Sequence, residues 1–252
     1  MHFSSRFLCA LALVSGSSAA LAQAPKGSKF PFPEKLTYRI EWRMINAGTA
    51  TVQLSRDQPD DWTVNLHLES AGLVSRLYRV LDSYKAAMTD RFCGISAQLD
   101  AQEGKRHTLT HLIFDDPQHK VEYNEHDVLK NTSAKNRLAI APCTHEITGA
   151  LAELRASDLQ PGHAVTIPIT NGKKMAHARV EAQAKERVSV NGKTYSTTRY
   201  EAFLFDNVLY KRKGTFFVWI TDDSERMPVQ FRIHLGFPVG TITISLEKEE
   251  RL

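Results

Sequence analysis

The sequence predicts an all-β protein: a mainly antiparallel, curved sheet in the form of a roll or half-barrel, with one short helix. Apolar and polar residues alternate with period two in run after run from residue 36 onward. Turn signals such as Asn171-Gly172 and Asn191-Gly192 separate neighbouring runs. Because the alternation continues almost to the end of the chain, we expect a single β domain over residues 36–249.

The alternating runs give the expected strands in chain order. They cover residues 36–43, 49–54, 61–68, 82–89, 95–102, 106–115, 119–125, 163–170, 174–187, 194–205, 214–221, 228–235 and 239–247. The first two runs form a hairpin, with Asn46-Ala47-Gly48 between them as the turn. A polar stretch at 130–137 shows no alternation and is not expected to form a strand.

Residues 144–156 are the one segment with a clear helical spacing. Ile147, Leu151 and Leu154 lie at i, i+4 and i+7, on one face of a helix. We expect this helix to cover or plug one open face of the sheet. Residues 71–81 also interrupt the alternation and are compatible with a short helical turn.

Residues 1–22 predict a cleaved export signal. Arg6 provides a positive charge, residues 7–14 are apolar, and Ala20-Leu21-Ala22 has the small-x-small pattern of a cleavage site. The apolar run is shorter than the roughly 20 residues that span a bilayer. We therefore expect cleavage near Ala22, a periplasmic location and an extended leader over residues 23–35. The alternative is an uncleaved N-terminal anchor.

The cysteines predict one disulfide. Cys9 leaves with the signal peptide, so the mature chain keeps Cys93 and Cys143. In an oxidising compartment such a pair favours a bond, with the two Cα atoms less than about 7 Å apart. The bond would close a loop of about 50 residues and contribute roughly 3 to 4 kcal/mol. Two separate buried thiols are the alternative.

Composition restricts the possible partners. With 42% apolar and 24% charged residues, the chain resembles an ordinary soluble globule. The formal net charge is +4, with basic residues scattered among acidic ones, so the footprint of a nucleic-acid-binding protein is absent from the sequence. After the signal peptide, no segment is long and apolar enough for a transmembrane helix.

Two groups contain residue types that bind metals. His107 and His111 are four residues apart, which on a strand separates them by about 13 Å, too far to share one ion. Cys143, His145 and Glu146 lie where the helix begins, and Glu146 is favoured there by the helix dipole. HExxH and CxxC motifs are absent from the sequence. We expect no metal ion and no cofactor.

The carboxylates of one turn, Asp222, Asp223 and Glu225, are candidates for the paired acids of a glycoside hydrolase. Neighbouring side chains at a strand end point in different directions, and an Asp-rich turn is expected there in any case. GxSxG, P-loop and GxGxxG motifs do not occur in the sequence. We assign no catalytic residue and regard an enzyme as less expected than a binding protein.

Clustered aromatic residues are the strongest indication of a ligand. Phe203 and Phe205 share one strand face, and so do Phe217 and Trp219. On neighbouring strands the four rings would form a concave apolar surface that binds a ligand. An ordinary filled core is the alternative interpretation.

Three segments together resemble a known family. They are residues 36–50 (LTYRIEWRMINAGTA), residues 75–84 (SRLYRVLDSY) and residues 219–231 (WITDDSERMPVQF), the last followed by Val239-Gly-Thr-Ile. In this order they are similar to the bacterial exported family catalogued as domain of unknown function 3108. The resemblance spans residues 36–247 and implies an exported or periplasmic all-β protein without assigned catalytic residues. The third segment is also similar to a hairpin of half-barrel carriers, which shuttle lipoproteins and other lipophiles across the periplasm.

Taken together, these features favour a non-enzymatic cell-envelope protein that binds a lipophilic or glycan component. The first alternative is an envelope assembly scaffold that contacts a protein partner through an exposed sheet edge. The second is a hydrolase whose acids come from distant strands. An apolar cavity would favour the binding protein, a long free edge the scaffold, and a polar cleft with converging carboxylates the hydrolase.

Overall fold

The computed structural model describes residues 29–236 and 238–252. The expected signal peptide, residues 1–22, and residues 23–28 of the expected leader lie outside the described residues. Within the described ranges, no helix is long and apolar enough to cross a membrane.

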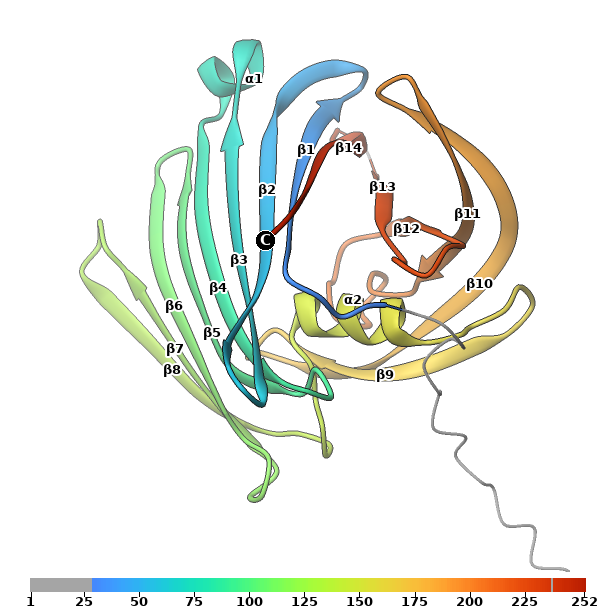
Figure 1. Ribbon diagram of the computed structural model, residues 1–252. Coiled ribbons are helices and arrows are strands. Elements are labelled where there is room, and N and C mark those ends of the chain that lie inside the picture. The colour runs from blue at the N-terminus through green and yellow to red at the C-terminus, as the bar shows by residue number, and fades with distance from the viewer. Residues whose placement is uncertain (1–28, 237) are drawn as a thin grey trace, which may run out of the picture.

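The described residues form one sheet of 14 antiparallel strands, which curves strongly without closing into a barrel (Figure 1). This arrangement confirms the predicted all-β class. The strands are β1 (Glu34–Trp42), β2 (Ile45–Gln58), β3 (Asp61–Ser70), β4 (Val80–Thr89), β5 (Gly94–Glu103), β6 (Arg106–Asp115), β7 (Lys120–Asp127), β8 (Thr132–Ala139), β9 (Ala164–Thr170), β10 (Met175–Val190), β11 (Lys193–Ala202), β12 (Gly214–Thr221), β13 (Pro228–Leu235) and β14 (Gly240–Arg251). The helices are α1 (Gly72–Leu77) and α2 (Ile147–Ala156).

Two meanders build the sheet. Consecutive strands pair with each other within β1–β8 and again within β9–β14. The last strand, β14, then pairs with the first through partners such as Ile40 and Ile244. The beginning and the end of the domain therefore lie side by side in the middle of the sheet, and β8 and β9 form its two edges.

The sheet has two differently shaped parts (Figure 1). Strands β9–β14 and β1–β3 curl around α2, and we call this part the barrel half. Strands β4–β8 extend away from it, and we call them the wing. The wing has a small core of its own, made of Ala86, Ala97, Leu112, Val121, Tyr123 and Ile140.

The wing also contacts the barrel half at the turn between β9 and β10. Asn136 Nδ2 of β8 donates a hydrogen bond to Gly172 O in that turn, at 3.1 Å. A Cβ atom on Gly172 would lie 2.2 Å from Leu112 Cδ2, so only glycine allows this approach. The two edges of the sheet thus meet at one point without pairing.

The first hairpin turn differs from the prediction. It lies at Arg43-Met44, where both residues have positive φ angles (51° and 66°), and not at Asn46-Ala47-Gly48. Gly48 is inside β2, where a Cβ atom would lie 2.1 Å from Glu69 O of β3. The glycine therefore serves close approach between two strands, which the sequence pattern does not distinguish from a turn.

Two other turn signals have different outcomes. Asn191-Gly192 forms the expected tight turn, with both φ angles positive (48° and 74°). At Asn171-Gly172 the connection is four residues long, because Thr170 pairs with Met175. Asn171 Oδ1 accepts hydrogen bonds from the two following lysine amides there, and this Asx turn replaces the two-residue hairpin.

Strand β8 was not predicted. Its residues, within the polar stretch that begins at 130, are exposed on both faces, except that Leu138 is half-buried. An edge strand with two solvated faces has no alternation to reveal it, and charged residues such as Lys135 and Arg137 are typical of such edges. The pairing of β8 with β7 is visible only in the tertiary structure.

Candidate functional site: an apolar cavity under helix α2

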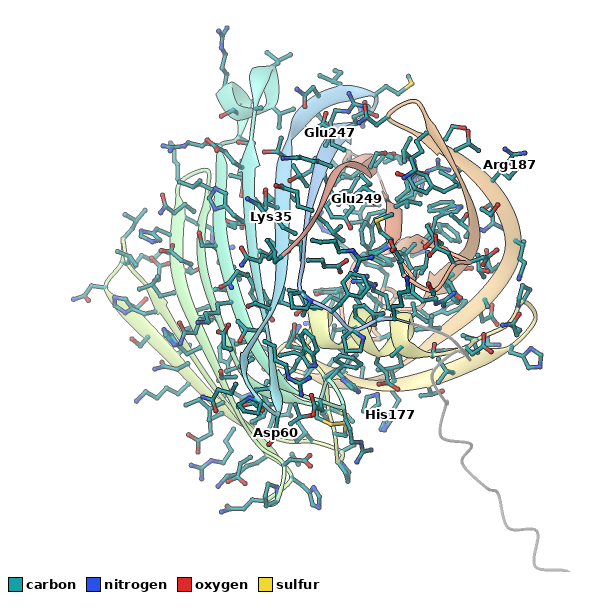
Figure 2. All side chains as sticks on the ribbon, in the orientation of Figure 1. Lys35, Asp60, His177, Arg187, Glu247 and Glu249 are labelled. Atoms are coloured by element: carbon teal, nitrogen blue, oxygen red, sulfur yellow. A yellow bond between two sulfur atoms is a disulfide. The ribbon has the colours of Figure 1, made fainter. Side chains whose placement is uncertain are left out.

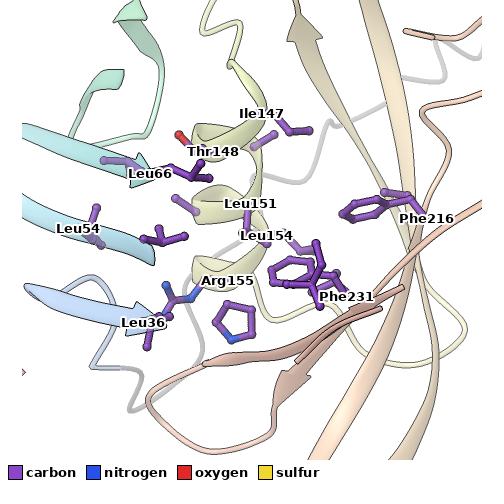
Figure 3. A pocket seen from close by; sticks show the side chains of 18 of the residues that line it. Leu36, Leu54, Leu66, Ile147, Thr148, Leu151, Leu154, Arg155, Phe216 and Phe231 are labelled. Carbon is purple, nitrogen blue, oxygen red and sulfur yellow. The ribbon is translucent and has the colours of Figure 1, made fainter. Parts of the chain in front are cut away.

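A cavity of about 250 Å³ lies between α2 and the concave face of the barrel half (Figure 3). Its volume is near the lower end of small-molecule sites. Most of its lining is aliphatic or aromatic, and the charged residues in it are Glu34 and Arg155. The wing strands contribute none of the lining residues.

Strand alternation explains why the cavity is apolar. On β10, Ala178 and Val180 line the cavity, whereas Arg179 between them is exposed. Figure 2 shows the corresponding outer side of β10, with Arg187 and His177 pointing away from the enclosed space. The strand therefore buries one face and solvates the other, as period two requires.

Helix α2 closes the cavity with the apolar stripe that the sequence predicts. Ile147, Ala150, Leu151 and Leu154 all line the cavity. Their spacing places them on one face of the helix. The helix itself runs over 147–156, as expected within three residues at its start.

The helix is anchored at its first turn by Glu146. Its carboxylate accepts hydrogen bonds from the amides of Thr148 and Gly149, at 2.7 and 2.5 Å. Tyr84 of β4 donates its hydroxyl to the same carboxylate at 2.6 Å. Burial and the neighbouring Glu146 raise the pKa of Tyr84 well above its ordinary value, so this hydroxyl keeps its proton. Glu146 is thus both the N-cap and the link to the wing.

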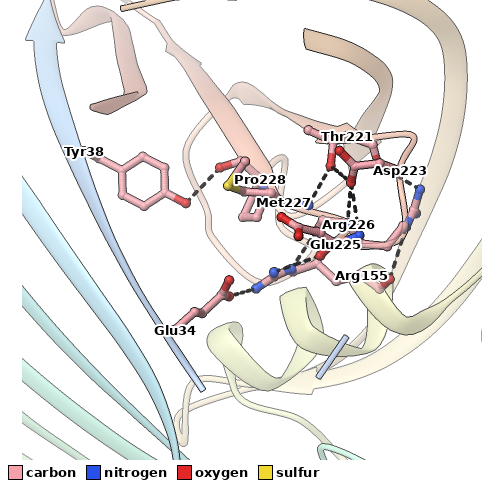
Figure 4. A network of polar contacts seen from close by, with 9 residues as sticks. All are labelled: Glu34, Tyr38, Arg155, Thr221, Asp223, Glu225, Arg226, Met227 and Pro228. Atoms are coloured by element: carbon pink, nitrogen blue, oxygen red, sulfur yellow. Dashed lines mark hydrogen bonds and ion pairs between the residues drawn. The ribbon is translucent and has the colours of Figure 1, made fainter. Parts of the chain in front are cut away.

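A buried ion pair forms the polar spot of the cavity wall (Figure 4). Arg155 Nη1 of α2 donates to Glu34 Oε1 of β1 at 2.5 Å, and both side chains are only 6% exposed. Arg155 Nε donates to Arg226 O at 2.7 Å. The guanidinium carbon lies 3.9 Å from the centre of the Phe30 ring. The charge of Arg155 is therefore compensated by a carboxylate, a carbonyl and an aromatic face.

Arg226 joins α2 to the turn before β13. The Nε of Arg226 donates to Arg155 O at 3.2 Å, and its Nη2 donates to the hydroxyl of Tyr200 at 2.9 Å. Tyr38 donates its hydroxyl to Pro228 O at 2.8 Å, and burial raises the pKa of Tyr38 far above its ordinary value. The polar groups at this end of the cavity thus have protein partners, which leaves the remaining wall apolar.

The disulfide predicted from the sequence is present beside the start of α2. The sulfur atoms of Cys93 and Cys143 are bonded, and the Cα atoms are 4.6 Å apart. His145 Nδ1 donates to Phe92 O at 2.7 Å, and burial lowers the pKa of His145. The bond fixes the turn between β4 and β5 against the segment that leads into the helix.

The four aromatic residues singled out in the sequence do not line this cavity. Phe217 pairs with Arg232 and Trp219 with Gln230, so both face the opposite side of β12 from the cavity. Phe203 is 36% exposed, and Phe205 packs against Tyr210. That these rings bind a ligand remains a prediction. The cavity is lined instead by their immediate neighbours Ala202, Leu204, Phe216 and Val218.

The other residue groups considered in the sequence have structural partners. His107 Nε2 lies 2.9 Å from Asp100 Oδ1 on the neighbouring strand, and His111 is exposed on β6. Asp223 Oδ1 accepts hydrogen bonds from Thr221 Oγ1 and from two amides of its own turn. In the described part of the chain, no group of three His, Cys, Asp or Glu residues is arranged to hold a metal ion.

A second hollow, of about 470 Å³, lies on the opposite face of β1–β5 and is polar. Hydroxyl, amide, imidazole and carboxylate groups surround it, from Thr51, Gln53, Asn65, His67, Ser83, Gln98 and Asp100. His67 Nδ1 lies 3.3 Å from Ser83 Oγ, so part of this surface is already hydrogen-bonded within the protein.

Sequence reasoning missed the cavity residues Glu34 and Arg155. Arg155 follows Leu154 and lies eight residues after Ile147, so it falls on the apolar stripe of the helix. A charged residue on such a stripe was the available signal for a buried partner. No comparable signal exists for Glu34, which lies in a polar segment of the sequence.

One solved structure shares this architecture. A solved β-barrel-like protein of domain of unknown function DUF1849 from Brucella abortus is similar, with a TM-score of 0.60 at 9% identity, over 92% of this chain and 100% of that one. A putative exported protein with a YmcC-like fold from Bacteroides fragilis matches with a TM-score of 0.39 at 9% identity, over 92% and 100% of the two chains. Among curated proteins, none matches this chain.

The likeness to the Brucella protein concerns the fold alone. The family model described as "Protein of unknown function (DUF3108)" matches residues 37–247, most of the chain. The matched range includes both helices and most of β1 and β14, whereas the lining residues Phe30, Glu34 and Leu36 lie before it. The chain belongs to the DUF3108 family.

Proposed function

We propose that this protein is an exported, non-enzymatic binding protein that holds a lipophilic molecule in the cavity under α2. The supporting observation is the combination of volume and lining: about 250 Å³ of space surrounded by apolar side chains. Water in such a space finds few hydrogen-bond partners on its walls, so an apolar molecule that takes its place is favoured by the burial of apolar surface.

The cavity chemistry favours a molecule with a long apolar part. Apart from the hydroxyl of Thr148, which donates to Glu146 Oε1 at 2.7 Å, the polar side chains at the wall lie near Arg155 and Glu34, and both of these are engaged with protein partners. A sugar would leave its hydroxyl groups unpaired against leucine and phenylalanine side chains, which costs free energy for each group. A glycan therefore fits the polar hollow on the opposite face better than the cavity.

One observation disfavours the scaffold, and another disfavours catalysis by the carboxylates of the turn at Asp222. The free edge strand β8 carries Lys135 and Arg137, which are typical of edges that avoid pairing with another strand. The two aspartates considered for hydrolysis are each hydrogen-bonded within the protein. Asp223 accepts from the amide of Glu225 in its own turn, and Asp222 accepts from Thr198 Oγ1 at 2.6 Å.

Native mass spectrometry of the protein purified from its own cell envelope tests the proposal. We expect a retained molecule that is extracted into organic solvent. The variant Ala150→Phe, which places a ring in the cavity from α2, should reduce its retention about tenfold because the ring occupies the same space.

Phe217→Ala is the matched control, since Phe217 lies on the opposite face of β12. It should leave retention unchanged. If Phe217→Ala releases the molecule and Ala150→Phe does not, the ligand lies on the aromatic surface singled out in the sequence and the cavity proposal is wrong. A retained sugar would point to the polar hollow instead.

A further inference from the structure

Three surface segments come together at the end of the molecule where β1 ends (Figure 1). The amide of Ala71 donates to Ala47 O at 2.8 Å, which holds the start of α1 against β2. Tyr78, just after α1, lies over Gly104 in the turn between β5 and β6, because a Cβ atom on that glycine would be 2.6 Å from Tyr78 Cε2. We call residues 43–45, 72–79 and 104–105 the apolar tip.

The apolar tip exposes large apolar side chains on two of its three segments. Met44 is 92% exposed, Leu77 70% and Leu73 56%. Tyr78 and Ile45 add 50% and 46%. Single exposed apolar residues are ordinary on a protein surface, but several on adjoining turns form a patch that marks an interaction site.

The cations of the tip are free to bind an external anion. Arg43, Arg76, Arg79 and Lys105 are exposed, and within the described residues none of them forms an ion pair with a carboxylate. Arg43 donates to Pro238 O and lies over the Trp42 ring, but it has no carboxylate partner among the described residues. Elsewhere, many exposed cations do have acidic partners, as Arg137 has in Glu122 at 2.6 Å.

The turn at Arg43-Met44 is chemically unusual for its geometry. Two-residue turns with positive φ angles favour Asn and Gly, and this chain uses that pair at Asn191-Gly192. At the tip, an arginine and a methionine adopt the same left-handed conformation, which is unfavourable for residues with a Cβ atom. The conformation of this turn is therefore less stable with Arg43 and Met44 than it would be with Asn and Gly. In return, the turn presents a cation beside an apolar side chain that projects into solvent.

We propose that the apolar tip binds the surface of a lipid bilayer that contains anionic lipids. Met44, Leu73 and Leu77 have the length to enter the boundary between headgroups and acyl chains. The arginines then lie at the level of the lipid phosphates, as amphipathic residues do at membrane interfaces. Projecting turns insert into a deformable lipid surface without the matching hollow that a protein partner would have to provide.

The tip is separated from helix α2 by the length of strand β1. Arg155 of α2 binds Glu34 at the beginning of β1, whereas Arg43-Met44 follows the end of the same strand. The helix and the tip therefore lie at opposite ends of the barrel half. The proposal itself stands independently of the cavity, because the binding of a bilayer requires no ligand there.

Sedimentation with lipid vesicles tests the proposal. The protein is used from Gln23 onward, so that apolar residues 7–14 do not bind lipid themselves, and the described fold from Lys29 onward is kept intact. Vesicles made of equal parts phosphatidylglycerol and phosphatidylethanolamine should bind the protein about tenfold better than phosphatidylcholine vesicles. Equal binding to both, or no binding to either, would overturn the proposal.

The double variant Arg43→Asn with Met44→Gly separates binding from folding. It gives the turn its preferred residues, so thermal stability should be retained or raised. Vesicle binding should nevertheless fall about tenfold, because one cation and one inserted side chain are lost. Unchanged vesicle binding by this variant would contradict the proposal.

A second pair of variants controls for general apolarity. Leu73→Ser with Leu77→Ser should also reduce vesicle binding about tenfold. Ile113→Ser is the matched control, since Ile113 is 59% exposed on β6, outside the tip, and it should leave binding within about twofold of the unmodified protein. Equal loss in Ile113→Ser would show adsorption without a specific surface and would overturn the proposal.

Discussion

The barrel half and the wing use strands of similar length and regularity, but they differ in what their inner faces contact. On β10 of the barrel half, the alternate residues Ala176, Ala178, Val180 and Ala182 are all buried. On β8 of the wing, only Leu138 is even half-buried. The difference is the presence of α2, which fills the curve of the barrel half and is not above β8 (Figure 1). The helix gives the concave face of the barrel half its core, whereas the wing's own core reaches the edge strand β8 only at Leu138.

Each part also contains an Arg–Glu ion pair, and the two pairs differ in how far they are buried. Arg155 and Glu34 form an ion pair whose side chains are 6% exposed, in the wall of the cavity. Arg137 and Glu122 form an ion pair on the wing whose side chains are 69% and 47% exposed. Water solvates and screens the second pair, whereas the first depends on its protein partners.

Breaking the two ion pairs should give the largest contrast between the parts. Arg155→Ala leaves Glu34 buried without its partner, so we expect a loss of about 3 to 5 kcal/mol in the free energy of unfolding. Arg137→Ala on the wing should cost less than about 1 kcal/mol. Urea denaturation of both variants measures this, and similar losses would contradict the contrast.

Removal of the disulfide tests how strongly the two parts are joined. The bond between Cys93 and Cys143 ties the turn between β4 and β5 to the segment before α2, across a sequence separation of 50. Replacement of both cysteines by alanine should lower the free energy of unfolding by about 2 to 4 kcal/mol, because the unfolded chain regains loop entropy.

Denaturation of this cysteine-free variant at increasing urea concentration provides the readout. We expect a single transition at a lower urea concentration, because the wing and the barrel half still unfold together. Two separate transitions would show that the disulfide is what couples them. A midpoint equal to that of the unmodified protein would contradict the expected stabilisation.

The hydroxyl of Tyr84 is a single contact between the wing and α2. Tyr84→Phe removes the hydrogen bond to the Glu146 carboxylate but keeps the ring and the two amide donors of the cap. We expect the free energy of unfolding to fall by about 1.5 to 3 kcal/mol, the range for a hydrogen bond to a charged group. Hydrogen exchange should accelerate at the first turn of α2. Faster exchange throughout β9–β14 instead would mean that this contact stabilises the whole barrel half.

Asp82 of the wing should give the smallest effect, with a defined dependence on pH. Burial, together with the charge of Glu103, raises the pKa of Asp82 to about 6 from its ordinary 3.8. Because the folded state binds the proton more tightly than the unfolded state, stability falls as the pH rises from about 4 to about 6. The side chain is partly exposed, so the loss is discounted for solvent screening to about 1 kcal/mol.

Asp82→Asn removes this titration and keeps an acceptor for the amide of Gln102, which donates to Oδ1 at 3.0 Å. The variant should be more stable than the unmodified protein by about 1 kcal/mol at pH 7.5 and equal to it near pH 4. A stability difference that does not change between these pH values would show that Asp82 is not the titrating group.

Most of the fold could be predicted because period-two alternation survives wherever one face is buried and the other is solvated. The strands β6, β12 and β13 have the same bounds as the predicted ones, and α2 lies within its predicted segment. The prediction failed where that asymmetry is lost. β8 is exposed on both faces, and Gly48 serves a close approach between strands where a turn was expected.

The candidate site was less predictable, because alternation groups residues by face without saying which face is inside. On β12, Phe217 and Trp219 form one apolar set, and Phe216 and Val218 form another. The two sets alternate along β12, so a shift of one residue exchanges the set on the inner face for the set on the outer face. Both sets are apolar, and the sequence does not show which of them faces inward. The structure places the second set at the cavity.

The sequence by itself determined the class of fold, the position of the one long helix and the pairing of Cys93 with Cys143, because these depend on local periodicity and on a count of cysteines. Tertiary structure decided the curvature around α2, the burial of Glu34 against Arg155 and the face of β12 that lines the cavity. The physical reason is that these features arise from contacts between residues distant in the chain: Glu34 and Arg155 are 121 positions apart. No local pattern encodes such a contact, whereas each strand carries its own alternation.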